Sequence, residues 1–424
     1  MPDVFLGIDV GTSGVRALAM DAEGMVLGQG TARMAEFGAD GRDPTVWRRA
    51  TEAALAELSR AVEPSRIVAL AVDGTSGTVL PVDGEGRPLA RALMYNDKVG
   101  DAAILDAVSR SAPAASAAHG PTSGLAKALS FQGAHGAAKI LHQADWIAGQ
   151  FSGCFDRSDA NNALKTGYDP VAERWPDWIA ETGMRLELLP DILEPGAPVG
   201  TVSAEAQEKF GFPDGALVVA GSTDGCASFL ATGASLIGEG VTALGSTLTL
   251  KLLSDRPIFA PQYGIYSHRV LGSWLAGGAS NTGGAVLAHF FEAEEIAEFS
   301  KRIDAEKPTG LDFYPLLSPG ERFPVSDPAL PPCLEPRPAE PGKFLQALLE
   351  GIAAIEALGY RRLEELGAPR LENIRTVGGG AKNTAWQAIR RKRLGVPLLS
   401  PASEEAAAGA ARLALVGAKQ AGLL

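Results

Sequence analysis

The residues best suited to chemistry come first in the chain, where an acid and a turn of small residues lie between two apolar runs. Val4–Ile8 leads into Asp9, Gly11–Gly14 forms the turn, and Val15–Met20 follows. This pattern predicts a β-hairpin. Glycines, hydroxyls and backbone N–H groups in the bend can wrap a phosphate closely. A Mg²⁺ ion between Asp9 and such phosphates would explain the acid, which is therefore a candidate metal residue acting through water. The alternative is an ordinary tight hairpin with Asp9 as a cap.

Asp224 is the candidate catalytic base. It follows the buried run Ala216–Ala220 and sits among small residues, where a substrate can approach. An alcohol that attacks phosphorus must lose its proton, and a carboxylate within hydrogen-bond reach can accept it. The alternative is that Asp224 caps the alanine-rich helix that follows.

Two further small-residue turns could bind a nucleotide. We expect Gly245–Thr247, between two short apolar runs, to hold the terminal phosphates from the side opposite Thr12. It lacks the lysine of a P-loop, and the sequence has no GxGxxG, so neither a Walker nor a Rossmann fold is predicted. Gly378–Gly380 lets a backbone approach a ring or an α-phosphate closely. Asn383 could bond an adenine edge or a ribose, and Trp386 could lie against the base. Alternatively, Asn383 is a helix cap and Trp386 a core residue.

Polar residues at the ends of short apolar runs are candidates for contacts with a second substrate. They are Thr75, Ser76, Asn96 and Asp97, each of which could equally be a turn former. Lys127 and His268 are weaker candidates, and His268 is assigned no role.

Alternating strands and helices must position these residues. We expect strands over 4–11, 15–22, 25–33, 67–72, 78–82, 216–220, 241–244, 248–252, 374–377 and 396–400. Helices are expected from 43 to about 62, over much of 101–152, and over 283–297, 344–366 and 384–394, with a last helix opening at 401–405. The second half repeats the strand–turn–strand pattern of the first. The sequence therefore predicts two related α/β domains that face each other.

Composition limits the classes of function. The chain has 424 residues and a net charge of −12, which suits a globular protein of two or three domains. The densest basic cluster, 390–393, suits a solvated helix end, and no basic stripe for nucleic acid is present. Three scattered cysteines indicate neither a disulfide framework nor a zinc site. We expect no membrane span or leader, and a cytoplasmic location.

Six segments, in order along nearly the whole chain, resemble the FGGY carbohydrate kinases of the actin/hexokinase/Hsp70-like ATPase superfamily. Each segment is a soft motif alone, and together they are fairly specific. They are GIDVGTSGVRALAMD (7–21), VDGTSGTVLPVDGEGRPL…YNDK (72–98), SDANNALKTGYDPVAERW (158–175), VVAGSTDGCASFLATGA (218–234), ALGSTLTL (243–250) and TVGGGAKNTAWQAIRRKRLGVPL (376–398).

This resemblance implies an α/β fold of two ribonuclease-H-like domains, with ATP and sugar in the cleft between them. The domains would be 1–214, with the first phosphate hairpin and the sugar site, and 215–424, with the catalytic acid, the second hairpin and the adenosine site. Asp224 aligns with the family's base, and Asp9 with the acid near Mg²⁺ and the sugar hydroxyl. The substrate set is Asp9, Thr75, Ser76, Asp97 and Asp224. The nucleotide set is Thr12, Ser13, Gly14, Val15, Arg16, Gly245, Ser246, Thr247, Gly378, Gly379, Gly380, Asn383 and Trp386.

The sequence also departs from the family pattern at the sugar turn. Bacterial xylulose kinases carry Met-His-Gly where this chain has Thr75-Ser76-Gly77, and the chain is shorter than most members. Both features are similar to the compact plant and cyanobacterial xylulose kinase-like branch, for which D-ribulose is the implied sugar. We therefore expect an ATP- and Mg²⁺-dependent D-ribulose kinase. D-Xylulose or another polyol is the alternative substrate. A non-catalytic sugar or nucleotide sensor and an actin-like ATPase are alternatives of other classes, and the oligomeric state is open.

Overall fold

The chain forms two compact units. The structure, a computed structural model, describes residues 3–424. Unit 1 comprises the chain up to Ala231 together with His268–Leu271 and Glu405–Leu424, and unit 2 comprises Thr232–Ser267 and Gly272–Glu404. This division differs from the expected boundary between residues 214 and 215. Residues 215–231 belong to unit 1 because β10 (Leu217–Thr223) pairs with strand β4 (Ile67–Gly74) of that unit.

Unit 1 is built on a six-stranded sheet with the order β3-β2-β1-β4-β10-β9. The remaining strands of this sheet are β1 (Val4–Val10), β2 (Gly14–Met20), β3 (Val26–Arg33) and β9 (Pro198–Thr201). The first three form an antiparallel meander, while β4 runs parallel to both β1 and β10. The carboxyl ends of β1, β4 and β10 therefore meet at one edge of the sheet.

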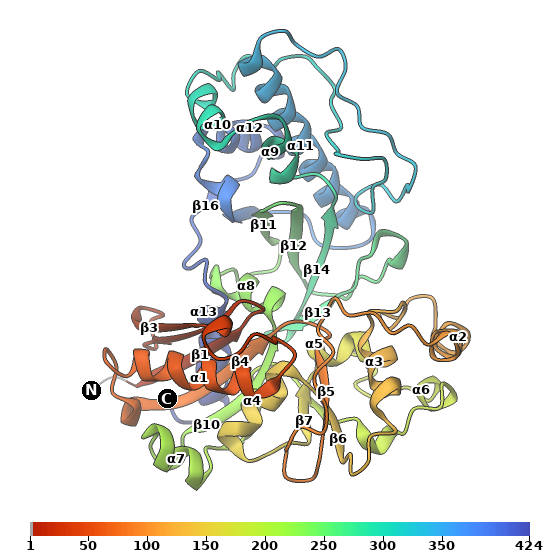
Figure 1. Cartoon of the computed structure of the whole chain (residues 1–424). Coiled ribbons are helices and arrows are strands. Elements are labelled where there is room, and N and C mark those ends of the chain that lie inside the picture. The colour runs from red at the N-terminus through yellow and green to blue at the C-terminus, as the bar shows by residue number, and fades with distance from the viewer. Residues whose placement is uncertain (1–2) are drawn as a thin grey trace. The chain divides into compact units, whose positions relative to one another are not determined.

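Helices cover both faces of this sheet. The last helix, α13 (Ala406–Gln420), packs on β1, β4 and β10, whereas α1 (Pro44–Leu58) packs on β2 and β3. In Figure 1 the blue α13 lies among the red and orange strands of unit 1. Gly7 faces α13, and Gly30 faces α1. Because side chains alternate along a strand and Gly7 pairs with Leu18 while Gly30 pairs with Ala17, these two helices lie on opposite faces.

Replacing Gly7 by alanine is expected to destabilise unit 1. A Cβ atom there would lie 1.8 Å from the carbonyl oxygen of Ala407 and 2.3 Å from the backbone nitrogen of Ala411, so α13 would have to move. Overpacking of this kind costs about 1–3 kcal/mol or more. Denaturant unfolding measures the loss. Gly200→Ala, where a Cβ would meet nothing within 4 Å, is the control and should change stability little. Equal stability of the two variants would contradict the expectation.

The rest of unit 1 completes the main core and adds a smaller cluster beside it; α4 (Gln143–Ser152) packs on β4 and β10, and α8 (Asp224–Ala231) packs on α13. Its two-stranded sheets pair β5 with β6 and β7 with β8. These remaining elements are β5 (Val79–Val82), α2 (Ala102–Ser111), α3 (Gly124–Phe131), β6 (Lys139–His142), α4 (Gln143–Ser152), β7 (Arg157–Asp159), α5 (Ala160–Ala163), α6 (Trp178–Glu181), β8 (Asp191–Leu193), α7 (Ala204–Phe210), α8 (Asp224–Ala231) and β13 (His268–Val270). Buried residues of β5, α2 and α3, among them Val79, Val108 and Leu125, form a separate hydrophobic cluster.

Unit 2 repeats the strand arrangement of unit 1. Its strands β14-β12-β11-β15-β16 run in this order, with an antiparallel meander of three followed by two parallel strands. They are β11 (Glu239–Leu244), β12 (Leu248–Ser254), β14 (Ser273–Ser280), β15 (Asn373–Val377) and β16 (Leu398–Leu399). The helices are α9 (Gly284–Phe290), α10 (Ala293–Ser300), α11 (Pro341–Glu365) and α12 (Thr384–Leu394). Their apolar faces enclose a second core.

This repeat confirms the predicted fold of two related α/β domains. The expected strands and helices are found within a few residues of their predicted bounds, with two exceptions. Residues 139–142 form strand β6 inside a region expected to be helical, and the single helix expected over 283–297 is divided into α9 and α10. Among residues 3–424, no helix combines the length and the apolar character needed to cross a membrane.

Candidate active site

Three aspartates meet at the carboxyl edge of the unit 1 sheet. Asp9 lies near the end of β1 and pairs in register with Asp73 of β4. Asp224 follows β10 directly as the first residue of α8. Asp9 is two residues after Gly7 and therefore lies on the same face of the sheet. Asp73 is the register partner of Asp9 on β4 and lies on that face as well, so both side chains project toward α13. The charge of Asp224 reaches both carboxyl groups and raises their pKa values. Sequence reasoning predicted Asp9 and Asp224 as site residues but gave Asp73 no role.

Asp73 is the aspartate of the three whose environment is fully buried. Its side chain has no exposed surface, and its carboxyl group shares a hydrogen bond with that of Asp9 but has no other partner among residues 3–424. Burial holds its pKa well above the usual range, and the charges of Asp9 and Asp224 add to the effect. Burial and the charge of Asp224 also raise the pKa of Asp9, while its hydrogen bond with Asp73 and the charge of Arg16 oppose that shift. Such crowding of acids requires protons or a cation for compensation.

A divalent cation fits this edge. Mg²⁺ is commonly held by one or two carboxylates and completes its shell with water and substrate phosphates. Asp9 and Asp73, whose carboxyl groups lie in register on neighbouring strands and contact each other, supply two such carboxylates. In residues 3–424 no group of three or more histidine, cysteine or acidic side chains could hold a metal on its own. These carboxylates therefore fit a cation whose coordination shell is completed by a bound substrate.

The predicted base also bonds to the start of its helix. The carboxylate of Asp224 accepts a hydrogen bond of 2.6 Å from the backbone N–H of Gly225. This bond fixes the carboxylate at the sheet edge. Asp224 is itself the first residue of α8, and the bond goes to the next residue, so it does not test the alternative that Asp224 caps the helix. The bond is compatible with a role as base, since a carboxylate oxygen has more than one acceptor position.

The first hairpin turn presents its hydroxyl residues to solvent. Thr12 and Ser13 are exposed, and the backbone N–H of Gly11 closes the turn on Gly14 O at 3.0 Å. The guanidinium of Arg16 pairs with Glu405 at 2.9 Å. The Val15 side chain is buried, so only its backbone is available to a ligand.

In unit 2, two predicted nucleotide turns lie side by side. Gly245–Thr247 is exposed between β11 and β12. Leu244 is the residue directly before that turn, and a Cβ on Gly378 would lie 2.8 Å from its carbonyl oxygen. One on Gly380 would lie 2.7 Å from the Leu244 side chain. The Gly378–Gly380 backbone therefore approaches the end of β11 as closely as glycine allows.

Asn383 is a helix cap and Trp386 a core residue, which are the alternative roles that the sequence left open for them. The Asn383 side chain accepts from Trp386 N at 3.0 Å as the N-cap of α12, and its amide donates to Ser300 Oγ at 2.8 Å. Trp386 is only 2% exposed and belongs to the core of unit 2, with its ring against Gly380. The stacking expected of Trp386 is corrected accordingly, because a buried ring supports the glycine turn from behind.

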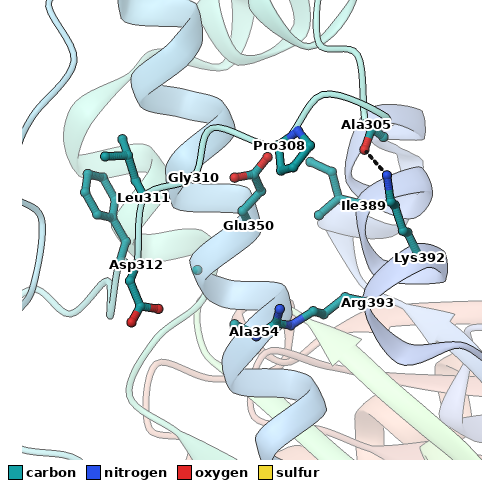
Figure 2. Close-up of a pocket in the computed structure, with 12 residues that line it drawn as sticks. Ala305, Pro308, Gly310, Leu311, Asp312, Glu350, Ala354, Ile389, Lys392 and Arg393 are labelled. Carbon is teal, nitrogen blue, oxygen red and sulfur yellow. Dashed lines mark hydrogen bonds between the residues drawn. The ribbon is translucent and has the colours of Figure 1, made fainter.

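Unit 2 also contains a pocket that none of these predicted residues lines. Its volume is about 440 Å³, and it lies between α11, α12 and the segment 305–313 (Figure 2). Lys392 is exposed in the last turn of α12, as expected, and bonds to Ala305 O at 3.4 Å and to the Glu306 carboxylate at 3.0 Å. Arg390 of the same basic cluster is fully buried, which differs from the expected solvated helix end.

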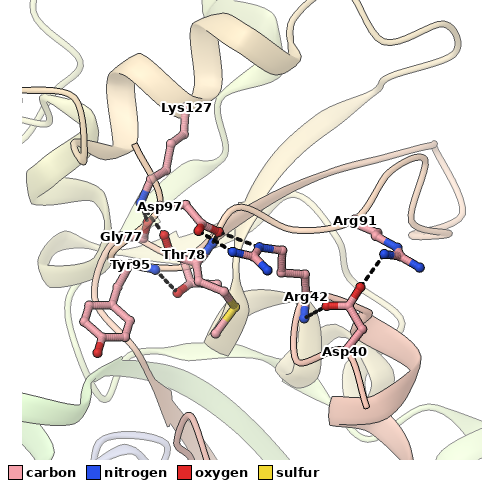
Figure 3. A network of polar contacts seen from close by, with 9 residues as sticks. Asp40, Arg42, Gly77, Thr78, Arg91, Tyr95, Asp97 and Lys127 are labelled. Atoms are coloured by element: carbon pink, nitrogen blue, oxygen red, sulfur yellow. Dashed lines mark hydrogen bonds and ion pairs between the residues drawn. The ribbon is translucent and has the colours of Figure 1, made fainter. Parts of the chain in front are cut away.

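The predicted sugar residues differ in how freely they can bind a ligand. The Thr75 hydroxyl is engaged with Thr78 Oγ1 at 2.6 Å and Gln143 Oε1 at 2.8 Å. The Asp97 carboxylate receives two hydrogen bonds, of 2.9 and 2.6 Å, from Arg42 (Figure 3). The polar atoms of these two side chains already have protein partners, and their oxygens keep further acceptor positions, so their contacts with a sugar stay predictions. Ser76 is half-buried, and no hydrogen bond of its hydroxyl occurs among residues 3–424.

Lys165 is a site residue that sequence reasoning missed. Its Nζ atom lies 3.5 Å from Ser76 O, and the charge of Asp224 acts on it. Lys165 is exposed, and partial desolvation of its ammonium group lowers its pKa, a shift that the charge of Asp224 opposes. The lysine thus links the turn at Ser76 to the acidic edge. The sequence signal that could have identified it is a single lysine directly after the apolar pair Ala163-Leu164.

The segment that leads to Lys165 carries a second buried acid, Asp159. Its carboxylate accepts hydrogen bonds from the backbone N–H groups of Asn161 and Asn162, and burial with the charge of Asp145 raises its pKa to about 7. Because this folded-state pKa exceeds the unfolded value, stability should fall as the pH rises from about 4 to about 7 and then level off. Asp159→Asn should flatten that pH dependence in denaturant titrations. An unchanged slope would contradict the assignment.

The same fold is found in solved kinase structures. A protein described as a xyloylose kinase from Brucella ovis superposes with a TM-score of 0.84 at 24% identity, covering 98% of this chain and 91% of that chain. The xylulose kinase from Rhodospirillum rubrum gives 0.83 at 22% identity, with 98% and 90% covered. These likenesses show the fold.

Family comparisons give the assignment. The N-terminal and C-terminal domains of the FGGY family of carbohydrate kinases match residues 4–112 and 236–418. The chain belongs to the FGGY family of carbohydrate kinases. Among curated proteins, the autoinducer-2 kinase of Yersinia enterocolitica serotype O:8 / biotype 1B is 30% identical over 301 residues, 64% of this chain and 56% of that protein. The chain thus spans little more than half the length of these curated relatives.

Proposed function

We propose that the protein is an ATP-dependent sugar kinase that converts D-ribulose to D-ribulose 5-phosphate. One observation carries the proposal: Asp224 follows β10 at the sheet edge where Asp9 and Asp73 lie. A carboxylate fixed there can take the proton of an acceptor hydroxyl. The exposed turns Gly11–Gly14 and Gly245–Thr247 supply backbone N–H groups suited to phosphates.

Each residue of the candidate site has a role that suits its side chain. Asp224 accepts the proton of the attacking hydroxyl, and Lys165 can donate hydrogen bonds to sugar oxygens beside it. The Ser76 hydroxyl contributes a further donor and acceptor. Asp9, through water, and Asp73 would hold Mg²⁺, which when bound neutralises the charge that develops on the transferring phosphoryl group. Positioning and charge stabilisation thus carry most of the catalysis.

D-Ribulose is proposed from the turn Thr75-Ser76-Gly77, which lacks the histidine of bacterial xylulose kinases. D-Xylulose is the second candidate, since several proteins of the same fold are described as xylulose kinases. Sugar specificity depends on a few hydrogen bonds whose loss in a buried site is costly.

A panel assay tests the proposal. The full chain is incubated with ATP, Mg²⁺ and one acceptor at a time, and ADP release is measured. The panel holds D-ribulose, D-xylulose, gluconate, glycerol and autoinducer-2. The highest kcat/KM is expected for D-ribulose. A higher value for another acceptor would replace the substrate, and ligand binding without ADP release would favour a sensor.

A further inference from the structure

Lys127 of α3 joins the two segments that hold the predicted sugar residues. Its side chain has no exposed surface. Its Nζ atom donates hydrogen bonds to Gly77 O at 2.8 Å and to Met94 O at 2.7 Å. Gly77 directly follows Ser76 in the chain, and Met94 lies three residues before Asp97. Figure 3 shows Lys127 beside Gly77 and Asp97. One ammonium group therefore connects residues 75–78 to residues 94–97.

This lysine is costly to bury. Burial lowers its pKa to about 8; the charge of Lys165 acts in the same direction, and the charge of Asp97 opposes both. Both of its hydrogen bonds within residues 3–424 go to backbone carbonyls, and neither goes to a carboxylate. An apolar side chain of similar length would fill the same space without desolvating a charge. The lysine is therefore best explained by the connection that its ammonium group makes between the two segments.

Other contacts brace the same two segments. The Thr78 hydroxyl accepts from the backbone N–H of Tyr95 at 2.9 Å and bonds to the Thr75 hydroxyl. Asp97 accepts from Met94 N at 2.8 Å while it pairs with Arg42. Gly77 adopts a left-handed backbone with φ of +87°, so its carbonyl is presented by a turn that few other residues would form. The Ser76 turn is thus held on several sides.

We propose that Lys127 is a positioning residue for the acceptor sugar. It fixes the turn at Ser76 against the Met94–Asp97 segment, so that Ser76 and the neighbouring Lys165 stay in place beside Asp224. The choice of substrate rests on the proposed function. Lys127 itself touches no sugar, and its effect is transmitted through the backbone of Gly77.

Lys127→Met tests this role in the full chain. We expect the KM for D-ribulose to rise about tenfold or more, because a displaced turn weakens sugar contacts, while the KM for ATP stays within about twofold. Lys98→Met, an exposed lysine on the neighbouring segment, should change neither value. An unchanged KM for D-ribulose in Lys127→Met would overturn the proposal.

A second lysine offers a matched control for simple destabilisation. Lys139 also donates to two backbone carbonyls, those of Glu187 at 3.0 Å and Leu189 at 2.8 Å. Lys139→Met should lower stability without raising the KM for D-ribulose. If both methionine variants raise that KM equally, the effect is general loss of stability and the proposal fails. Should Lys127→Met not fold, Thr78→Val removes another link between the same segments and should raise the same KM.

Hydrogen exchange separates failure of this inference from failure of the proposed function. In Lys127→Met the amides of Thr78, Tyr95 and Asp97 should exchange faster than in the wild type and in Lys139→Met, without any substrate. Unchanged exchange would overturn the bracing role even if the protein is a D-ribulose kinase. Faster exchange in a wild-type protein that phosphorylates no sugar would support the bracing contact and reject the assigned substrate.

Discussion

Asp224→Asn should lower sugar-dependent ADP release by a factor of about 10³, since a general base contributes about 10²–10⁴ to the rate. Asparagine preserves the volume and still accepts the Gly225 N–H bond of 2.6 Å, but it cannot take a proton from the sugar hydroxyl. The fold and nucleotide affinity should therefore stay near wild type. Steady-state kinetics and calorimetric titration with an ATP analogue measure the two quantities.

An acid outside the site provides the control for Asp224→Asn. Asp106 is exposed on α2, and Asp106→Asn should retain wild-type kcat. Sugar-dependent turnover of Asp224→Asn at the wild-type rate would remove the base from the proposed mechanism.

The second large effect is expected on stability, at the buried ion pair of unit 2. Arg390 donates two hydrogen bonds to Glu356, of 2.6 and 2.7 Å, and both side chains are fully buried. Arg390 also donates to Thr376 of β15 at 2.8 Å. Arg390→Met leaves a buried carboxylate without its partner, which costs about 3–5 kcal/mol. The free energy of unfolding should fall by that amount in denaturant titrations.

Two controls sharpen this test. The double variant Glu356→Leu with Arg390→Met removes both charges and should recover much of the loss, because apolar replacements of buried pairs are often nearly neutral. Arg302→Met breaks an exposed pair with Glu298 and should cost under about 1 kcal/mol. Equal losses in the exposed and the buried single variants would contradict the assignment.

Local sequence patterns were sufficient to predict the strands that position Asp9 and Asp224. The run before Asp9 and the run before Asp224 are short, apolar and bounded by small residues, which is the pattern of buried strands. The meander and its repetition follow from such runs. Strand β6 was missed because 139–142 is short and ends in polar residues that pair with β5, a contact set by tertiary structure.

Long-range pairings explain what the sequence left open in the candidate site. Asp97 was predicted to bind substrate from its sequence position alone, and the structure adds that Arg42, distant in sequence, donates to both of its carboxylate oxygens. Asp73 becomes conspicuous only when β4 is placed beside β1, which brings it opposite Asp9. Trp386 could have stacked on a base or entered the core, and only packing against Gly380 distinguishes the two. Such choices depend on partners far along the chain.

The packing of α13 onto β1 has a consequence for biosynthesis. The strand is among the first segments to leave the ribosome, whereas the helix that covers its Gly7 face is made after all of unit 2. An apolar sheet face must therefore wait uncovered during translation, when nascent chains are prone to aggregation. Chaperone capture of the nascent chain should persist until α13 emerges, and ribosome-bound chains stalled before residue 405 should remain sensitive to protease within β1.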